Sequence, residues 1–382
     1  MIIIKKVFLA AVVLSVIISA CAPAPQAPEQ TQEQTEEQPQ EQPREMDRVR
    51  VVLQWVAQAQ FAGYFAALDQ GFYEEEGLEV EIKPGGPDII PVQVVGAGEA
   101  EFGINPFIVT LQSREAGADV VAIATVIQRV SQVLVSFKSA GIETVSDIEG
   151  HRMGSWLGGN EAEQFALLRK YELDPEADVE VVKQGFDMSQ LLNGDIDVAQ
   201  ALIYNEYAQL LEIENPETGE LYTPEDFNAI SLDEEGIRAI QDTIFTTNSW
   251  LSAPGNEEIA IRFLKGTLKG WIFCRDNRDE CVDIVLDAGS ALGESHQTWQ
   301  MNEVNALIWP APSGVGFPND PELVDSTIEL ALTYDLISNQ PQEDAWRFDL
   351  VQRAVDELRA EEIDVVGDNF VKGTVELRPG GE

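Results

Sequence analysis

Aromatic and amide side chains gather where a predicted strand ends near residue 55. The stretch LQWVAQAQFAGYFAAL, residues 53–68, ends its strand-like part at Trp55 and then supplies Gln58, Gln60, Phe61 and Tyr64. Aromatic faces hold another flat ring by offset stacking, and each side-chain amide carries both a donor and an acceptor. Since open α/β sheets bind ligands beyond the carboxyl ends of their strands, this stretch predicts a site for a flat, polar-edged ring.

Similar residues follow other predicted strands. In WLGGNEAE, two glycines let the backbone approach a ligand, and the next helix offers free N–H groups; a turn that needs glycine is the alternative. Core packing is the alternative for the aromatic residues, particularly Phe61 and Phe186. The predicted ligand-binding residues are Trp55, Gln58, Gln60, Phe61, Tyr64, Asn105, Trp156, Gly158, Gly159, Asn160, Glu161, Phe186, Asp187, Tyr204, Asn205 and Glu206.

Catalytic and metal-binding patterns are missing from the sequence. The only histidines are His151 and His296, and no Cys or His has metal-ligand spacing. No serine elbow, phosphate-binding loop or dinucleotide fingerprint occurs. Pairs of carboxylates carry little information because 67 acidic residues make them expected by chance. We therefore predict a protein that is not an enzyme and that holds no metal or cofactor.

The charge balance restricts the partners. With 24 basic and 67 acidic residues the formal net charge is −43, which repels nucleic acid and anionic lipid surfaces. An anionic ligand would need a basic residue in the site. Arg129 is the one candidate beside a predicted strand end, and a surface position is its alternative. We expect a neutral or weakly charged ligand.

Strand-like and helix-like stretches alternate from residue 49 to about residue 250, and a helical tail runs to about residue 360. Repeated βα units predict parallel sheets with helices on both faces. The simplest arrangement is an α/β fold of two lobes with a hinge and a ligand cleft between them. Lobe one is expected at 49–138 and 245–372, lobe two at 139–244, with crossings near Phe137–Gly141 and Thr243–Thr247.

Both ends of the chain predict little packed structure. Lys5 and Lys6 precede an apolar run that is too short to span a bilayer and is typical of a signal peptide, residues 1–20. The run ends in ISAC, which resembles a bacterial lipobox with Cys21 as the lipidated residue; a plain signal peptide is the alternative. Residues 21–48, rich in Pro, Gln and Glu, predict a disordered tether, and residues 373–382 a flexible tail.

Cys274 and Cys281 are seven residues apart in CRDNRDEC. On one continuous helix they would lie roughly 10.5 Å apart along the axis, too far for a disulfide. Asp276 and Asn277 favour a helix break, which would make a disulfide feasible and consistent with an oxidising compartment. Two unpaired thiols are the alternative.

The stretches LQWVAQAQFAGYFAALDQGFYEEEGLEVEIKPGG, GAGEAEFGIN and SDIEGHRMGSWLGGNE resemble the thiamine-pyrimidine-synthesis-like branch of periplasmic solute-binding proteins, with their sulfonate-binding cousins. The likeness covers most of 49–275. It implies the two-lobed type II periplasmic-binding-protein fold and hinge closure on a ligand. The implied partners are the permease and ATPase subunits of an ABC importer, and the implied location is the outer face of the cell membrane, through the lipid anchor.

Differences from the family's motif narrow the choice of ligand. Its aminopyrimidine binders resemble a W-x-P-N-x-x-H-x-G pattern, where this chain has Trp55, Ala57, Gln58, Phe61 and Gly63. The related fungal enzyme that makes the thiamine pyrimidine consumes its own histidine and needs a cysteine cluster, and this chain has neither. An enzyme of that kind is therefore the least favoured alternative.

A riboflavin-uptake subgroup resembles this chain at five stretches. They are Trp55–Ala67, Gly85–Ile89, Gly158–Glu161, Phe186–Met188 and Tyr204–Tyr207. This resemblance implies riboflavin as the ligand, with an aminopyrimidine thiamine precursor as the alternative. The residue types alone indicate only a planar heterocycle.

Overall fold

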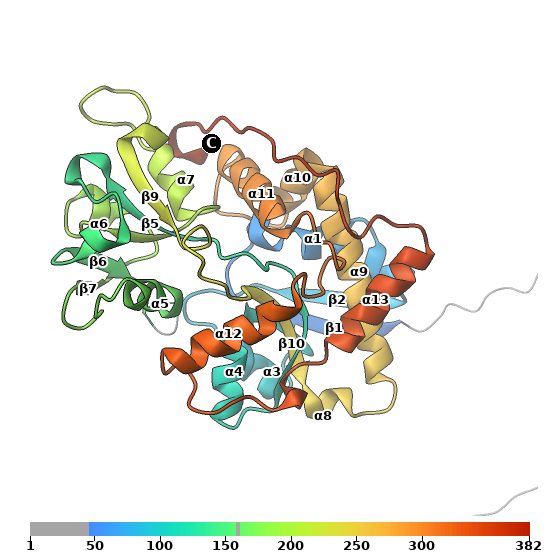
Figure 1. The fold of residues 1–382 in the computed structure, drawn as a ribbon. Coiled ribbons are helices and arrows are strands. Elements are labelled where there is room, and N and C mark those ends of the chain that lie inside the picture. The colour runs from blue at the N-terminus through green and yellow to red at the C-terminus, as the bar shows by residue number, and fades with distance from the viewer. Residues whose placement is uncertain (1–45, 158–160) are drawn as a thin grey trace, which may run out of the picture. The chain divides into compact units, whose positions relative to one another are not determined.

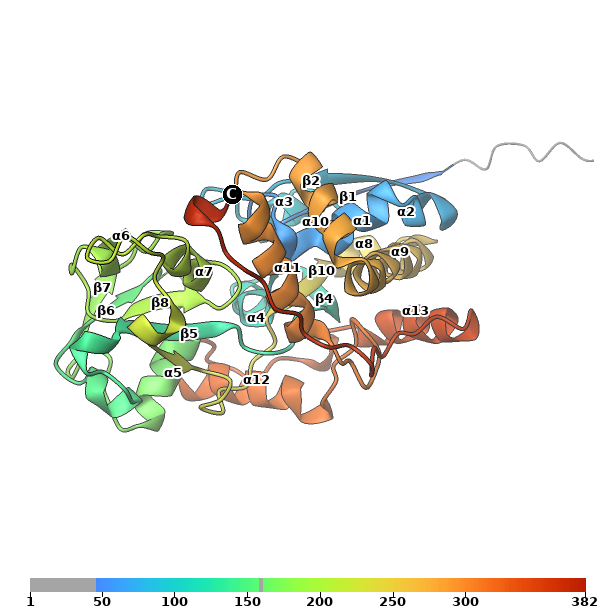
Figure 2. The ribbon, with the colours of Figure 1, turned by 90° about the horizontal axis from the view of Figure 1, so that it is seen from above.

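The computed structural model describes residues 46–157 and 161–382. The predicted signal peptide, residues 21–45 of the predicted tether, Cys21 among them, and three predicted site residues, Gly158, Gly159 and Asn160, lie outside the described residues. The last two residues assigned to the tether, Asp47 and Arg48, instead belong to the first strand. Within them, two sets of strands form two lobes (Figures 1 and 2). In the part of the chain that is described, no helix combines the length and apolarity that crossing a bilayer requires.

The first lobe is built on a five-stranded sheet of order β2-β1-β3-β10-β4. Its strands are β1 (Asp47–Val52), β2 (Leu78–Lys83), β3 (Phe102–Pro106), β4 (Val120–Thr125) and β10 (Asp242–Thr247). β1 runs parallel to β2 and β3, whereas β10 is antiparallel to both β3 and β4. All six residues of β10 are buried, as expected for a strand covered on both faces.

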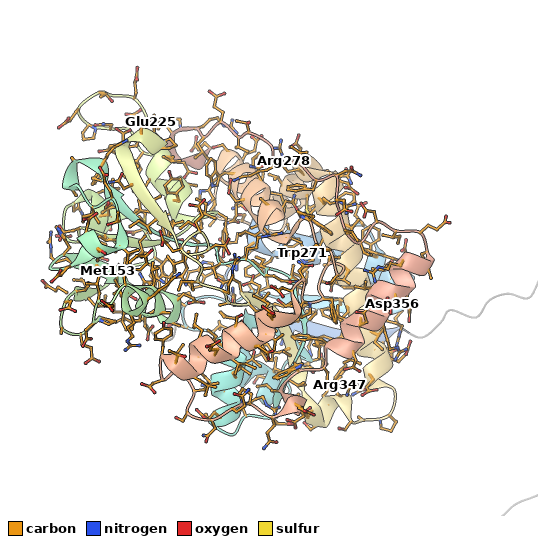
Figure 3. All side chains as sticks on the ribbon, viewed as in Figure 1. Met153, Glu225, Trp271, Arg278, Arg347 and Asp356 are labelled. Carbon is orange, nitrogen blue, oxygen red and sulfur yellow. A yellow bond between two sulfur atoms is a disulfide. The ribbon has the colours of Figure 1, made fainter. Side chains whose placement is uncertain are left out.

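The second lobe contains two smaller sheets. β5 (Gln132–Phe137) pairs antiparallel with β8 (Ala199–Leu202) and β9 (Phe227–Ser231). β6 (Arg152–Ser155) pairs parallel with β7 (Glu180–Lys183). An isolated bridge between Met153 and Val198 connects the two sheets, and Met153 is labelled in this lobe in Figure 3.

The strands differ from expectation in three ways. Only the β6-β7 sheet is purely parallel. The β8-β5-β9 sheet is antiparallel, and the five-stranded sheet is mixed, because β10 re-enters the first lobe from the end that faces the second lobe and so runs in the opposite direction. β9 was not predicted. The connections between lobes span 126–131 and 232–241, earlier than expected, because β5 already pairs within the second lobe. Backbone hydrogen bonds join the two connections, with Gln241 N donating to Ile127 O at 3.1 Å.

The helices cover these sheets. The α-helices are α1 (Ala62–Asp69), α2 (Phe72–Glu75), α3 (Pro91–Gly96), α4 (Phe107–Glu115), α5 (Ala162–Lys170), α6 (Ser189–Leu192), α7 (Glu206–Leu211), α8 (Asn248–Leu251), α9 (Asn256–Asp276), α10 (Arg278–Asp287), α11 (Glu294–Ile308), α12 (Pro321–Thr333) and α13 (Phe348–Ala360). The 3-10 turns are η1 (Ala59–Phe61), η2 (Lys138–Ala140), η3 (Val145–Ile148), η4 (Pro224–Asp226), η5 (Glu343–Ala345) and η6 (Pro379–Gly381).

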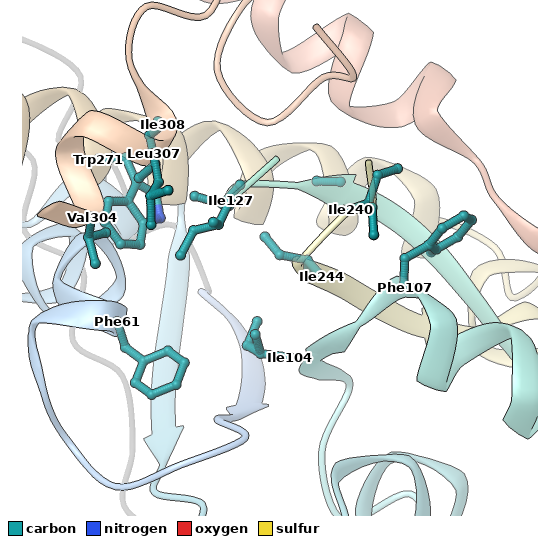
Figure 4. Packing of buried hydrophobic residues seen from close by; sticks show 14 of the residues in the cluster. Phe61, Ile104, Phe107, Ile127, Ile240, Ile244, Trp271, Val304, Leu307 and Ile308 are labelled. Carbon is teal, nitrogen blue, oxygen red and sulfur yellow. The ribbon is translucent and has the colours of Figure 1, made fainter. Parts of the chain in front are cut away.

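Helices α1 and α9 cross with their backbones in contact. A Cβ atom on Gly270 would lie 1.9 Å from the carbonyl oxygen of Gly63, and one on Gly63 would lie 2.3 Å from the Trp271 ring. Both positions therefore require glycine. This crossing fixes the start of α1, and Figure 4 shows Trp271 packed beside Val304 and Leu307, with Phe61 also in the core.

The helix break predicted between the two cysteines is present. α9 ends at Asp276 and α10 begins at Arg278, with Asn277 at φ −131° and ψ 57°. The break brings the Cα atoms of Cys274 and Cys281 to 5.2 Å, and the two sulfur atoms are bonded.

The C-terminal residues, for which a flexible tail was expected, contact two helices in the structure. Gly373 N donates to Asn302 Oδ1 at 2.9 Å, and Lys372 forms an ion pair with Glu303 at 2.6 Å, both on α11. Gly380 N then donates to Glu212 O, at the end of α7, at 2.9 Å. Gly380 has φ +68°, a conformation that glycine adopts readily. The tail thus joins a helix of the first lobe to one of the second.

Candidate functional site

Three predicted aromatic residues from the two lobes meet. Trp55 follows β1, whereas Trp156 and Phe186 follow β6 and β7. The ring centroids of Trp55 and Phe186 lie 4.9 Å apart at a tilt of 51°, and those of Trp156 and Phe186 lie 6.4 Å apart at 25°. Trp156 Nε1 donates to Gly185 O at 3.0 Å, which fixes its ring. Phe186 is 52% exposed, so its face is available to a ligand.

A buried carboxyl group lies at the start of β10. Asp242 Oδ1 accepts a hydrogen bond from Gln54 Nε2, and Asp242 Oδ2 accepts one from Gln60 Nε2, both at 2.9 Å. Gln58 Nε2 donates to Gln60 Oε1, also at 2.9 Å. Gln58, Gln60 and Asp242 are buried. The predicted amides after β1 therefore form a chain of hydrogen bonds that ends on a carboxyl group.

Helix α11 holds the turn that carries these amides. The backbone N–H groups of Ala59 and Gln60 donate to Gln297 Oε1 and Gln300 Oε1, at 2.6 and 3.1 Å. N–H groups at the first turn of a helix have no partner within the helix, and the two glutamines supply one. The spacing of three residues places both amides on one face of α11.

Burial controls the protonation of this group. Desolvation raises the pKa of Asp242 to about 6, although the hydrogen bonds from Gln60 and Gln54 act to lower it. Burial also raises the pKa values of Tyr64 and Tyr204 well above normal, and the charge of Asp242 adds to both shifts. Tyr64 lies in the first lobe and Tyr204 in the second, so Asp242 acts electrostatically on both.

A second buried carboxyl group, on the second lobe, contacts the connection that leads into β10. Glu163 of α5 accepts hydrogen bonds from Gln132 Nε2 and Gln241 Nε2, each at 3.2 Å. Burial raises the pKa of Glu163. Because Gln241 and Asp242 are adjacent, this one segment binds a side chain of the second lobe and two side chains of the first.

Asn205 joins the start of α7 to α11, and Glu206 holds Asn205 in place. Asn205 Nδ2 donates to Glu206 Oε1 at 2.6 Å, and burial raises the pKa of Glu206. His296 of α11 bridges both ends of α7, with Nε2 3.0 Å from Asn205 Oδ1 and Nδ1 2.7 Å from Glu212 Oε1. The structure therefore gives these two predicted residues a place in a contact between the lobes.

Other predicted residues have structural roles. Phe61 is fully buried in the core, which was its alternative, and Tyr64 packs edge-on against Trp271 at 6.1 Å. Asn105 Oδ1 accepts from Thr110 of α4, while its Nδ2 has no partner among the described residues. Asp187 accepts from Ser189 N at 2.9 Å. Glu161 precedes α5.

A row of unpartnered polar atoms crosses the first sheet beside the site. Asn105, Thr243 and Thr125 are neighbours in register on β3, β10 and β4. Asn105 Nδ2 and the two threonine Oγ1 atoms are buried without a hydrogen-bond partner among the described residues. Buried polar groups normally find a partner, so this row can bind water or a ligand.

Sequence reasoning missed several residues. Asp242, Gln54, Gln132, Glu163, Gln241, His296, Gln297 and Gln300 were not predicted. Three of them carried a signal. Asp242 is an acidic residue at the head of the apolar strand DTIFTT, and Gln297 and Gln300 repeat an amide at helical spacing.

The guanidinium group of Arg129 is hydrogen-bonded within the protein. Its guanidinium group donates to the carbonyl oxygens of Leu307 at 2.7 Å and Pro310 at 3.0 Å. It thereby caps the C-terminal end of α11, a favourable place for a cation. The residue considered for an anionic ligand is thus a helix cap.

A separate cavity of about 760 Å³ lies at the break between α9 and α10. Its lining includes Arg275, Arg278 and Asn305, and Arg278 is labelled in Figure 3. Arg275 and Arg278 pair with the neighbouring Asp276 and Asp279. Residues of the aromatic and carboxyl groups do not line it. Within the described residues, no group of three His, Cys, Asp or Glu side chains is arranged to hold a metal ion.

Comparisons with known proteins identify the family. Residues 58–281 match the model of a family described as NMT1/THI5 like. A 4-amino-5-hydroxymethyl-2-methylpyrimidine phosphate synthase of Schizosaccharomyces pombe is 27% identical over 153 residues, which are 40% of this chain and 44% of that protein. A synthase of the same name from Legionella pneumophila is 32% identical over 108 residues, 28% of this chain and 34% of that protein. The chain therefore spans less than half the length of either relative.

Solved structures identify the fold. The alkanesulfonate-binding protein SsuA from Xanthomonas axonopodis pv. citri, bound to MOPS, superposes with a TM-score of 0.55 and 16% identity. The superposition covers 81% of this chain and 98% of that one. The prediction of a two-lobed α/β fold of the periplasmic-binding-protein class is confirmed.

Proposed function

The chain belongs to the NMT1/THI5-like family, and on that premise we propose that it is the solute-binding component of an ABC importer, capturing a planar nitrogen heterocycle between its lobes. The observation that carries this proposal is the contact of Trp55 with Phe186 at 4.9 Å. These residues belong to different lobes, and Gln54, which precedes Trp55, donates to the buried carboxyl group of Asp242 at 2.9 Å. A flat ring that stacks on both aromatic side chains would bridge the lobes and favour their closure.

Riboflavin is the first candidate for the ligand. It is supported by the resemblance of the stretches around Trp55, Phe186 and Tyr204 to a riboflavin-uptake subgroup. An aminopyrimidine precursor of thiamine is the second candidate. It is supported by the names of the two synthases, which make such a pyrimidine, and by a buried carboxyl group that can accept N–H donors.

The proposed role is binding without chemistry. Although the two relatives are named as enzymes, neither the histidine nor the cysteine cluster that the resemblance associates with pyrimidine synthesis has a counterpart in the sequence. The buried carboxyls Asp242 and Glu163 are held by glutamine amides. In this proposal they position a ligand, which is then delivered to a membrane permease and its ATPase.

The proposed location is the outer face of the cell membrane. It is supported by the apolar run of residues 7–18 and the ISAC sequence that ends at Cys21. A lipid on Cys21 would anchor the protein, and the stretch rich in Pro, Gln and Glu would hold the lobes away from the membrane. Mass spectrometry of the membrane-extracted protein tests this: an N-terminal Cys21 with a diacylglyceryl group on its sulfur is expected, and an unmodified Cys21 thiol would refute it.

Binding measurements test the ligand. Titration with riboflavin should quench flavin fluorescence with submicromolar affinity if riboflavin is the solute. Calorimetry with hydroxymethylpyrimidine should show saturable heat if the second candidate is correct. Binding of neither at tens of micromolar would refute the heterocycle proposal. Turnover of a pyrimidine or pyridoxal compound would refute the proposal of binding without chemistry.

A further inference from the structure

We infer that Asp242 is the residue that reads the edge of the ligand, and that it selects a ring carrying an amidine edge, namely a basic ring nitrogen next to an amino group. This inference rests on the proposed function, because it names the ligand class of the same site. It distinguishes the two candidates, since an aminopyrimidine has such an edge and the corresponding edge of a flavin is a ring N–H flanked by carbonyl groups.

The hydrogen bonds of Asp242 leave two of its acceptor positions unused. A carboxylate offers about four acceptor positions, two on each oxygen. Gln54 uses one on Oδ1 and Gln60 uses one on Oδ2. One acceptor position therefore remains on each oxygen, which is what a two-point contact with an amidine edge requires. Such paired, charge-assisted hydrogen bonds are roughly twice as strong as neutral ones.

Asp242 also has no positive partner. Its hydrogen bonds within the described residues come from neutral glutamine amides, and no lysine, arginine or histidine among those residues forms an ion pair with it. A buried carboxylate without a cation is costly and tends to become protonated. A basic ligand removes this cost by taking the proton and forming an ion pair.

A neutral amide would suffice for a flavin edge. Three glutamines already lie here, and an asparagine at position 242 would present one donor and one acceptor to a ring N–H and its neighbouring carbonyl. A carboxyl group surpasses an amide where the ligand carries a basic atom or presents two N–H donors. A flavin edge has neither property, whereas a protonated amidine edge has both, so the acid at this buried position favours the amidine edge over the flavin edge.

Proton linkage follows from this contact. The complex holds one proton between the carboxyl group and the ring nitrogen, whichever atom carries it. The pKa of free Asp242 is raised to about 6 by burial, so binding at higher pH must take up a proton. Affinity should then fall by up to about tenfold for each pH unit above 6.

The two buried tyrosines near Asp242 do not produce the same profile. Tyr64 on α1 and Tyr204 between β8 and α7 feel its charge, and burial keeps their pKa values well above the normal range. Both therefore stay neutral between pH 6 and 8. Glu163, Glu206 and His296 are the other titratable groups around these elements, and all three are retained in the Asp242→Asn variant, which separates their contribution from that of Asp242.

The test compares the purified protein with Asp242→Asn by calorimetry. Hydroxymethylpyrimidine should bind the variant at least about tenfold more weakly at pH 7, with a flat profile from pH 6 to 8. Riboflavin binding should be unchanged or stronger in the variant. Asp119→Asn is the matched control, since Asp119 lies at the opposite end of the same sheet, where it accepts from Ser249 N at 2.9 Å.

Proton uptake gives a measurement that needs no variant. Titrations of the unaltered protein at pH 8, in buffers of different ionisation enthalpy, should show about one proton taken up with hydroxymethylpyrimidine. Pyrimidine binding with no proton uptake, or with equal affinity in Asp242→Asn, would overturn the inference while the proposed function stands. Binding of riboflavin alone would overturn it as well. Failure of both ligands to bind would instead refute the proposed function.

Discussion

Gln60 donates a hydrogen bond to Asp242 across 182 positions of sequence, with 2.9 Å between Nε2 and Oδ2. The contact joins the turn after β1 to the first residue of β10, where the chain returns from the second lobe. The amide turn and the return strand therefore hold each other in place. Any movement at the connection between the lobes is transmitted to the residues that were predicted to bind the ligand.

Phe186→Ala should weaken ligand binding with little effect on stability. One aromatic contact contributes about 0.5–1.5 kcal/mol beyond burial, which corresponds to a loss of roughly two- to tenfold in affinity. The side chain is 52% exposed, so the midpoint of thermal unfolding should barely change. Titration with whichever of riboflavin and hydroxymethylpyrimidine binds the unaltered protein measures the effect.

Phe72→Ala is the matched control for this variant. Phe72 pairs with Phe273 at 6.3 Å on α2 and α9, outside the site. Its removal should leave affinity unchanged. Equal affinities in all three proteins would show that the aromatic group does not contact the ligand.

Asp242→Asn should stabilise the ligand-free protein at high pH. The pKa of Asp242 is raised in the folded state from 3.8 to about 6, so the folded state binds this proton more tightly than the unfolded state. Its contribution is fully present below pH 3.8 and is lost as the pH rises through 6. With about 1.4 kcal/mol per pKa unit, the variant gains at most roughly 3 kcal/mol at pH 8, measured by urea unfolding.

The gain should shrink near pH 4, and Asp119→Asn should behave in the opposite way. Burial acts to raise the pKa of Asp119, but hydrogen bonds from Ser249 outweigh it and lower the pKa. Removing that carboxylate should therefore cost stability at pH 8. A gain for Asp242→Asn that is the same at both pH values would contradict the assigned cause.

His296→Ala should destabilise the protein by about 2–3 kcal/mol. The variant leaves the buried side chains of Glu212 and Asn205 without their shared partner, and an unsatisfied buried polar group costs about 1–3 kcal/mol. Urea unfolding measures the change. His151, whose nearest carboxylate is Asp197 at 3.7 Å and whose side chain is 40% exposed, provides the control; His151→Ala should change stability by less than about 0.5 kcal/mol.

Truncation after Leu377 should loosen the end of α7. It removes the hydrogen bonds from Arg378 N to Ser295 Oγ and from Gly380 N to Glu212 O. Two net hydrogen bonds correspond to about 1–3 kcal/mol. Amide exchange should accelerate at residues 206–212, and Arg378→Ala alone, which removes only an exposed ion pair with Glu294, should not have this effect. Unchanged exchange after truncation would contradict the assigned role of the tail.

Local pattern predicted most helices and strands because their apolar spacing is regular. It also placed Trp55, Trp156 and Phe186 together, since all three follow strand ends. It could not reveal the direction of β10, which depends on where the chain re-enters the sheet. It also missed Asp242 as a site residue, because the partners Gln54 and Gln60 lie far away in sequence and become neighbours only in the folded sheet.

The insertion of β10 between β3 and β4 constrains the order of assembly. During synthesis from the N-terminus, β4 is made long before β10, the strand that must join β4 to the rest of the sheet. The whole intervening region, including every strand of the second lobe, comes first. Until β10 is synthesised, the facing edges of β3 and β4 consequently have no pairing strand. Pairing of β10 with both is therefore a late step between segments distant in sequence, and such steps are slow.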